Sequence, residues 1–455
     1  MKLPVNIVSE PDRLARAARV LLYATAFVPA VVVPGFFFPY VTTRAVFFRA
    51  LVEIATAMLL YVTVRREVRF RVRRDVVFWA LVAWVAANAL AAAFGVSPLR
   101  SVFGDYERMG GVWFWIHLLA YYVLLRAFFQ PAHWWIFLRI SVAIASAIAA
   151  YGLVQDWFHP FSLGIAGVAH GATVGNSGLL AAYLLANIAF AGLLAIRGGW
   201  RSRTAYVAIA VLLLVALVFS GNRSSTLALL LGSGTALVAY FHWNGLLRGL
   251  RLFAVASLVF LTGLLPFATR AEWARPATSR IPALSRLSSG VVSRRVIQWR
   301  AAVDGIRARP LLGVGPENYH VIWSQYHHPE MYRFVGDSRW DRAHNAYLDA
   351  FATAGILGFL SLLAVCIALG WASRQASRRS RSDGRGRARE FGLAEAIALG
   401  FFVAYAFYLF FWFFDLNSTM FWVALAAFVA TRATGESLVE IGPLREKRWQ
   451  SSVVL

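Results

Sequence analysis

The chain has 455 residues, of which 59% are hydrophobic and only 15% are charged, and its mean hydropathy is +0.60. A soluble domain is typically about 45–50% apolar and about 25% charged, so this composition excludes one aqueous core and makes lipid the solvent for much of the chain. The formal net charge of +23 comes from arginines that cluster between apolar runs. This placement favours anionic lipid headgroups and anionic substrates and argues against nucleic acid. A lone cysteine, Cys366, excludes an internal disulfide.

Twelve apolar runs are long enough to cross a bilayer, because about 20 residues span about 30 Å of hydrocarbon. The predicted spans lie near residues 18–37, 46–64, 76–95, 111–128, 134–152, 177–196, 204–220, 224–242, 251–268, 346–372, 391–413 and 417–432. No cleavage signature precedes the first run, so we expect it to remain as the first helix. The sequence therefore predicts an all-α integral membrane protein of about 12 transmembrane helices. Its parts are helices one to nine in 1–268, a long outer loop in 269–345, helices ten to twelve in 346–432 and a tail in 433–455.

The short loops indicate the orientation, because cytoplasmic loops carry an excess of arginine and lysine. Basic residues lie before the first span and after the second, sixth, eighth, tenth and last spans, for example Arg13, Arg65, Arg197, Arg248, Arg374 and Arg445. All of them fall on one side if the spans alternate from a cytoplasmic N-terminus. The pattern predicts an inner-membrane protein with both termini cytoplasmic and loop 269–345 on the opposite face, since long loops translocate largely regardless of charge. The basic segment 373–390 is expected to be a solvated loop.

Arg223, in the sequence FSGNRSST, lies between two apolar runs. A charge so close to the bilayer is costly and marks a candidate functional site. Serines and a threonine follow it at an expected helix N-terminus, where backbone N–H groups and hydroxyls suit phosphate oxygens. The alternative is an arginine that reaches from the interface into water.

Arg294 and Arg295 open an amphipathic stretch in the outer loop. Apolar residues recur there at helical spacing, namely Val296, Trp299, Ala302, Val303 and Ile306. This periodicity predicts a helix on the membrane surface, whose arginines bind either a substrate or only lipid headgroups. The sequence LLGVGPENY follows, and its glycines form either a phosphate-binding turn or a plain turn.

His344 and Asn345 lie where the outer loop re-enters the membrane as the tenth helix. A histidine at this position can act as a general base, because its pKa lies near the operating pH, or it can make a structural hydrogen bond. Three further histidines of the loop, His320, His327 and His328, match no established zinc spacing, so we expect no metal.

Two other polar positions flank predicted helices. Arg108 follows Asp105 and Glu107, and it either pairs with these carboxylates or binds the substrate. Asn176 begins the sixth span, where a helix cap is its expected role.

Together these segments resemble the bacterial O-antigen ligase and O-antigen polymerase superfamily. The matching stretches are FGDYERMGG, TVGNSGLLAAYL, the S-x-N-R element from Ser220 to Arg223, the R-x-x-x-W element from Arg295 to Trp299, RPLLGVGPENY and HNAYLDAFATAGILGFL. They occur in the family's order across roughly residues 95–365. The last two stretches are fairly specific to the superfamily, whereas each short element alone is weak.

The resemblance implies an inverting, class-C-type glycosyltransferase that uses undecaprenyl-pyrophosphate-linked glycans at the periplasmic face, without a metal or other cofactor. By position, Arg223 and Arg295 match the arginines that hold the donor pyrophosphate, and His344 matches the histidine that activates the acceptor hydroxyl. The doubled arginine leaves Arg294 as an alternative to Arg295. We add Arg108 to the pyrophosphate-binding set, and the supporting residues are Asn345, Ser220, Trp299 and Asn176.

Three functions remain open at this point. A ligase that moves O-antigen polysaccharide onto lipid A core sugar is favoured over an O-antigen or exopolysaccharide polymerase, because the chain has no large soluble appendage. A transporter of lipid-linked anionic glycans is disfavoured, because charged residues are scarce inside the spans and the polar groups gather at one face. A purely structural membrane protein is disfavoured by the arginines of the outer loop.

Overall fold

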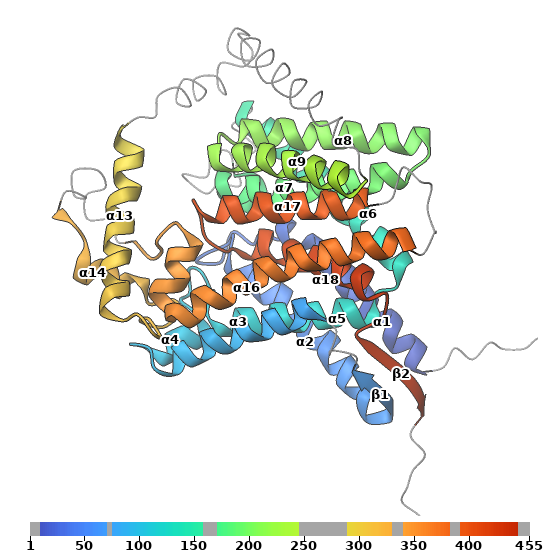
Figure 1. The fold of residues 1–455 in the computed structure, drawn as a ribbon, viewed down its shortest axis with the longest axis horizontal. Helices are drawn as coiled ribbons and strands as arrows, with labels where there is room; N and C mark the ends of the chain where they lie inside the picture. The colour runs from blue at the N-terminus through green and yellow to red at the C-terminus, as the bar shows by residue number, and fades with distance from the viewer. Residues whose placement is uncertain are drawn as a thin grey trace, which may run out of the picture.

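Long helices that run in alternating directions make up most of the computed structural model, which describes residues 10–70, 75–157, 171–244, 289–329, 340–382 and 392–444 (Figure 1). The long helices are α1 (Glu10–Ala24), α2 (Thr42–Arg65), α3 (Val76–Ala93), α5 (Val112–Phe128), α6 (Pro131–Trp157), α7 (Ser177–Arg197), α8 (Trp200–Phe219), α9 (Arg223–Trp243), α16 (Ala346–Ser382), α17 (Leu393–Leu409) and α18 (Leu416–Thr434). The shorter elements are η1 (Thr25–Ala30), α4 (Pro98–Phe103), η3 (Ala172–Val174), α13 (Ser289–Ala308) and α14 (Tyr319–Tyr326).

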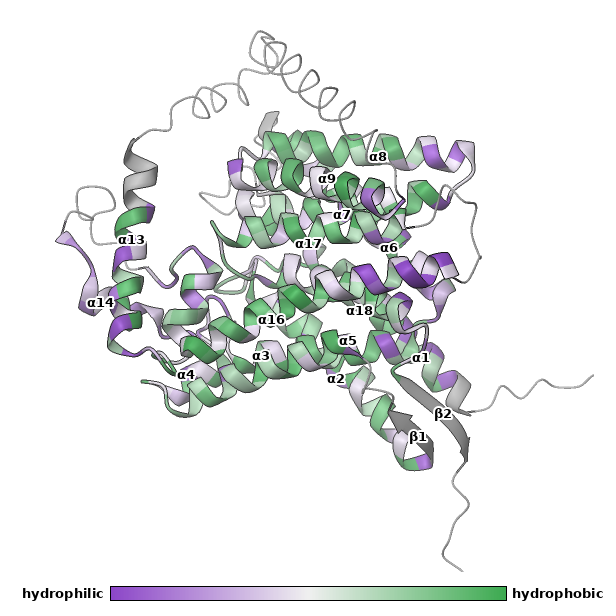
Figure 2. Ribbon diagram, in the orientation of Figure 1, coloured by the Kyte–Doolittle hydropathy of each residue, from purple (hydrophilic) through white to green (hydrophobic). Residues whose placement is uncertain are grey.

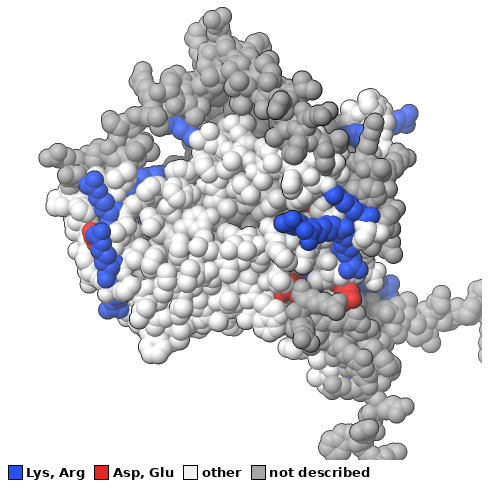
Figure 3. All heavy atoms as spheres, in the orientation of Figure 1, with Lys and Arg blue, Asp and Glu red and all other residues white. Residues whose placement is uncertain are grey.

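Seven of these helices are long and apolar enough to cross a membrane, namely α2, α3, α6, α7, α8, α9 and α16. The apolar helices α5 and α17 are shorter. Hydrophobic residues dominate the middle of the bundle, and hydrophilic residues gather near its two ends (Figure 2). Lysine and arginine lie at the left and right ends of the space-filling view, with an uncharged surface between them (Figure 3). The chain is therefore a multi-pass membrane protein, as its composition predicts.

Most predicted spans coincide with helices, but two boundaries are wrong. The first predicted span continues to residue 37, whereas α1 ends at Ala24 and the 3-10 helix η1 ends at Ala30. Pro29 and Pro34 lie at this break, and a proline removes a backbone donor that a helix needs. The tenth span was expected to end at residue 372, yet α16 continues to Ser382. Arginine is a good helix former, so the basic segment stays helical to that residue. The ninth predicted span, 251–268, lies outside the described residues.

Small residues let helices approach closely in the core. A Cβ atom built on Gly232 in α9 would lie 2.5 Å from the carbonyl oxygen of Gly400 in α17, and the reverse distance is also 2.5 Å. Such contacts between glycines are typical of helix packing in membranes, where dispersion forces replace the hydrophobic effect. They hold α9, which carries Arg223, against α17, which leads to the aromatic residues described below.

A short antiparallel pair of strands lies below the bundle, at the lower right of Figure 1. Strand β1 (Arg66–Phe70) pairs with β2 (Val439–Leu444), and Arg69 is opposite Glu440. The sequence analysis expected loop and tail in these two segments. At the same end, Arg126 and Asp75 form an ion pair of 3.1 Å with both side chains only 1% exposed.

The outer segment that precedes α16 crosses the left end of the bundle in Figure 1. Helix α13 packs on α14 and α16, and a second small core forms there from Ile297, Ala302, Val314, Tyr319, Ile322, Trp323, Ala343 and Ala352. The expected apolar face of α13 is only partly correct. Ala302 is buried, but Val296 is 37% exposed, and the polar Gln298 is fully buried. Gln298 lies on the buried face of α13 because its side chain donates a hydrogen bond to the carbonyl of Arg342, in the loop before α16.

Backbone hydrogen bonds join residues 310–315 to α16 at the point where that helix is interrupted. Gly355, inside α16, has a φ of +63°, so the helix is interrupted there. The amide of Ile356 donates to the carbonyl of Pro310 (2.9 Å), and the amide of Gly315 donates to Thr353 (2.8 Å). These bonds occupy amides that a phosphate would need, so G-V-G-P is a turn that joins the outer segment to α16.

Candidate functional site

His344 lies among aromatic rings at the end of the bundle where the outer segment crosses. Its ring centroid lies 4.7 Å from that of Trp340, 5.6 Å from that of Trp412 and 5.4 Å from that of Phe413. Its φ of +50° is a left-handed conformation, which costs energy for a residue with a side chain. The backbone thus holds the imidazole in a defined position just before α16, rather than leaving it on a free loop.

The imidazole of His344 is neutral at neutral pH. Its pKa is lowered to about 4, first by burial and then by the positive charge of Arg295. The carbonyl of Arg342 and the carboxylate of Asp341 act in the opposite direction but are weaker. A neutral imidazole can accept a proton, which is the requirement for a general base.

Gln298 lies within hydrogen-bonding distance of the imidazole of His344. Its amide nitrogen donates to the carbonyl of Arg342 and lies 3.2 Å from Nδ1 of His344, which is itself 3.4 Å from the same carbonyl. If Gln298 donates to Nδ1, the ring proton sits on Nε2. If Nδ1 donates to the Arg342 carbonyl, Nε2 is free to accept a proton. The role of His344 therefore depends on which of these two bonds forms.

Arg295 brings a positive charge next to His344. Its Nη1 atom donates to the carbonyl of His344 at 3.1 Å and to the carbonyl of Phe411, and its guanidinium lies 5.7 Å from the ring centroid of Trp412. Burial lowers the pKa of Arg295. The contacts use carbonyl oxygens and no carboxylate, so the positive charge is not neutralised by an ion pair in the described part of the chain.

Arg223 begins α9 at the same end of the bundle. Asn222 caps that helix, because its side chain accepts from the amide of Ser225 at 2.9 Å. A Cβ atom on Gly178 would lie 2.9 Å from Nδ2 of Asn222 and 2.8 Å from Cζ2 of Trp412, so α9 begins beside the aromatic residues around His344. Within the described residues the half-buried guanidinium of Arg223 has no hydrogen bond or ion pair.

Arg108 approaches His344 from the other side of Phe413. Its guanidinium lies 5.0 Å from the ring centroid of Phe413, and its Nε atom bonds Asp341 at 2.6 Å. The prediction that Arg108 pairs with its neighbouring carboxylates is only partly correct. Nη2 of Arg108 lies 3.4 Å from Glu107, but Asp105 accepts a hydrogen bond from the backbone amide of Arg108 and not from its side chain. The main partner, Asp341, comes from the far end of the outer segment, which the sequence spacing does not reveal.

The remaining expected residues have identifiable structural contacts. Asn345 caps α16 through bonds of 3.0 and 3.1 Å, and Asn176 caps α7, as its position predicts. Ser220 is buried and donates to the carbonyl of Leu217 at 2.6 Å. Trp299 packs against Phe410 at 5.5 Å. The side chain of Arg294 lies outside the described residues.

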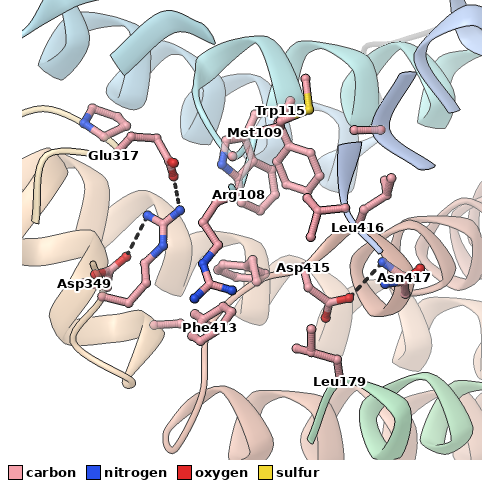
Figure 4. Close-up of a pocket in the computed structure, with 18 of the residues that line it drawn as sticks. Arg108, Met109, Trp115, Leu179, Glu317, Asp349, Phe413, Asp415, Leu416 and Asn417 are labelled. Carbon is pink, nitrogen blue, oxygen red and sulfur yellow. Dashed lines mark hydrogen bonds and ion pairs between the residues drawn. The ribbon is translucent and has the colours of Figure 1, made fainter. Parts of the chain in front are cut away.

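A cavity of about 90 Å³ lies beyond Arg108 and Phe413 (Figure 4). Arg342 forms ion pairs there with Glu317 and, at 3.7 Å, with Asp349, and these carboxylates raise the pKa of Arg342. Asp415 faces the cavity from the start of α18, and burial raises the pKa of its carboxyl group. None of these four residues was among the predicted site residues, although Glu317 and Asp349 lie within matching stretches of the sequence.

Two buried indole N–H groups also face this region without a partner among the described residues, those of Trp340 and Trp412. Unpaired buried donors are uncommon, and here both lie in rings that contact His344. Sugar hydroxyl or phosphate oxygens are acceptors that would satisfy them. The described site thus combines cations, unpaired donors and a neutral imidazole at one face of a membrane protein.

These features define a multi-pass membrane protein with a polar site that contains several arginines at one end. Residues 208–363 match the family model described as O-Antigen ligase, a stretch that covers about a third of the chain and includes Arg223, Arg295 and His344. This match confirms the resemblance to the O-antigen ligase superfamily that the motifs predict. No curated protein is significantly similar to the chain.

Proposed function

We propose that the protein is an O-antigen ligase that transfers polysaccharide from undecaprenyl pyrophosphate onto a lipid A core sugar. The family supports a ligase-type or polymerase-type activity on lipid-linked polysaccharide. The observation that carries the proposal is the neutral imidazole of His344 beside the guanidinium of Arg295, at the bundle end where α9 begins with Arg223.

The leaving group explains the need for arginines. When the bond between the anomeric carbon and the pyrophosphate oxygen breaks, its electron pair goes to the pyrophosphate. Arg295 and Arg223 are suited to stabilise that charge, since guanidinium groups bind phosphate oxygens strongly and are preorganised in the site. The N-terminus of α9 adds backbone N–H groups directed at the same anion.

His344 is suited to handle the acceptor proton. As the acceptor hydroxyl oxygen bonds the anomeric carbon, its proton passes to a ring nitrogen of His344, which is neutral before the reaction. A single displacement of this kind inverts the anomeric configuration. In this role Nε2 accepts the proton, so Nδ1 keeps its own proton and donates to the Arg342 carbonyl. The competing donation from Gln298 must then be lost when the substrates bind.

The proposed orientation places His344 at the periplasmic face of the inner membrane and both chain termini in the cytoplasm. The uncharged band between two charged ends supports a membrane position (Figure 3). The basic ends of α7 and α16 lie opposite to His344, which agrees with the excess of arginine in cytoplasmic loops. The total of twelve spans and the periplasmic loop 269–345 are parts of this proposal.

A transfer assay with purified protein, lipid-linked glycan and lipid A core tests the function. We expect His344→Ala to lower the rate of transfer about 10²–10⁴-fold, the usual contribution of a general base, while donor binding is retained. The matched control is His328→Ala, a histidine of the same outer segment that lies near Asp304 (3.8 Å). Full activity of His344→Ala would remove His344 as the base.

The product decides between the two activities of the superfamily. Polymer moved onto lipid A core supports the ligase, whereas a ladder of growing lipid-linked glycan identifies a polymerase. Transfer in detergent without sealed vesicles separates both from a transporter of lipid-linked glycans, which would show none.

A further inference from the structure

A second cavity, of about 700 Å³, lies at the end of the bundle opposite to His344. The first turn of α6, the last turns of α7 and α18, and the C-terminal part of α16 form its walls. The ends of α7 and α16 that line it carry arginines, and hydrophilic residues gather at this end of the bundle (Figures 2 and 3). The proposed transfer reaction uses none of its residues.

Three arginines line this cavity, namely Arg197, Arg379 and Arg432. Arg432 bonds Glu395 at 2.6 Å, and that carboxylate is 1% exposed. Arg379 donates to the carbonyl of Thr434 at 2.5 Å. Arg197 lies over the ring of Trp135, with 4.4 Å to the centroid, and within the described residues its guanidinium has no hydrogen bond or ion pair. The positive charge of Arg197 is therefore available to an anion.

Neighbouring cations would make the binding of an anion at Arg197 more favourable. Arg432 and Arg139 both act unfavourably on the charge of Arg197, so these groups lie within electrostatic range of one another. Glu395 is already paired with Arg432. An added anion at Arg197 would relieve the repulsion without displacing an existing ion pair.

An unpaired buried donor supplies the independent evidence for a ligand. Trp134 lines the cavity, is only 2% exposed, and its indole N–H has no partner in the part of the chain that the structure describes. Indole N–H groups usually find a partner when buried. A phosphate oxygen placed between Trp134 and Arg197 would accept from both.

The surroundings identify the ligand as amphiphilic. Aromatic rings of Trp135 in α6 and Phe428 in α18 line the cavity, and Ile136, next to Trp135, is 41% exposed. Aromatic residues beside arginines at a membrane interface are typical of lipid headgroup sites, and basic pockets between transmembrane helices bind anionic lipids. We propose that this cavity binds the phosphodiester headgroup of an anionic phospholipid.

Native mass spectrometry of the full-length protein tests the proposal. The detergent-solubilised protein is incubated with phosphatidylglycerol or phosphatidylcholine, and retained lipid is counted. We expect the wild type to retain phosphatidylglycerol preferentially and Arg197→Gln to retain it about fivefold less, as one interfacial cation predicts. Arg201→Gln is the matched control, because Arg201 is an exposed arginine at the start of α8 and does not line the cavity.

Two further variants separate binding from misfolding. Arg197→Lys keeps the charge and is expected to keep the preference for phosphatidylglycerol, while Trp134→Phe keeps the ring, removes the N–H and is expected to weaken retention. The proposal fails if the wild type does not distinguish the two lipids, or if Arg201→Gln loses as much lipid as Arg197→Gln. Displacement of the lipid by millimolar inorganic phosphate would also overturn it, because the site would then hold a soluble anion.

Discussion

Replacing Arg295 with glutamine removes a positive charge beside His344 and is expected to move the acid limb of the pH–rate profile to higher pH. The base is active only when the imidazole is neutral, so transfer is lost as the pH falls through its pKa. That pKa is lowered to about 4 in the wild type, by burial first and by Arg295 second. Without Arg295 the pKa rises, and protonation begins at a higher pH.

The size of the shift follows from the charge and its surroundings. A unit charge at roughly 7 Å, with an effective dielectric constant of about 20, contributes about 2 kcal/mol, or roughly 1.5 pKa units. Burial of His344 is the larger cause and persists in the variant. We therefore expect the acid limb of Arg295→Gln between about pH 5 and pH 6.

Initial rates of glycan transfer between pH 3.5 and pH 8, each normalised to the plateau of the same variant, measure this shift. Normalisation matters, because Arg295 is also proposed to bind the pyrophosphate. Arg295→Lys keeps the charge, so its limb should stay near that of the wild type even if its plateau is lower. Arg300→Gln removes an exposed arginine from the same helix as a control. An unchanged limb in Arg295→Gln, or an equal shift in Arg300→Gln, would refute the electrostatic link to His344.

Three other variants test the neighbouring contacts. Glu317→Gln removes a buried ion-pair partner of Arg342 and is expected to destabilise the protein by about 3–5 kcal/mol. This loss would be measured as a lower thermal unfolding midpoint. The control is Asp304→Asn, which breaks an exposed ion pair and should cost about 0–1 kcal/mol. Asn345→Ala deletes the cap of α16 and should cost about 1 kcal/mol in the same measurement, with Asn345→Ser largely restoring it. Arg223→Gln should weaken binding of a lipid pyrophosphate about tenfold or more, in line with a lost charge-assisted hydrogen bond; unchanged binding would assign Arg223 to lipid headgroups alone.

The sequence predicted the helices well because their signal is local. The signals can be recognised from residues that are close together in the chain. They are apolar runs of sufficient length, arginines at one set of helix ends and capping residues such as Asn176. Errors arose where longer-range contacts decide the outcome. The strands β1 and β2 pair residues that are far apart in sequence, and Arg108 bonds Asp341 across the outer segment.

The site was only partly predictable for the same reason. His344, Arg295 and Arg223 could be singled out because charged residues near a bilayer are rare. Gln298 carries no such signal, since a glutamine in an amphipathic helix is usually solvated, and only the packing of α13 buries it against His344. The ion pair between Arg342 and Glu317 was not predicted, because it forms only when the turn at Gly313 and Gly315 brings the two residues together.

The backbone bonds between residues 310–315 and the interrupted turn at Gly355 also fix the position of the outer segment on α16. A Cβ atom at Gly355 would lie 2.0 Å from the carbonyl oxygen of Leu311, so no other residue fits this junction without displacing one of the two segments. The junction acts as a fixed pivot. The segment that follows α13 is therefore tied to the interior of α16, and this attachment limits how far the two helices can move relative to each other.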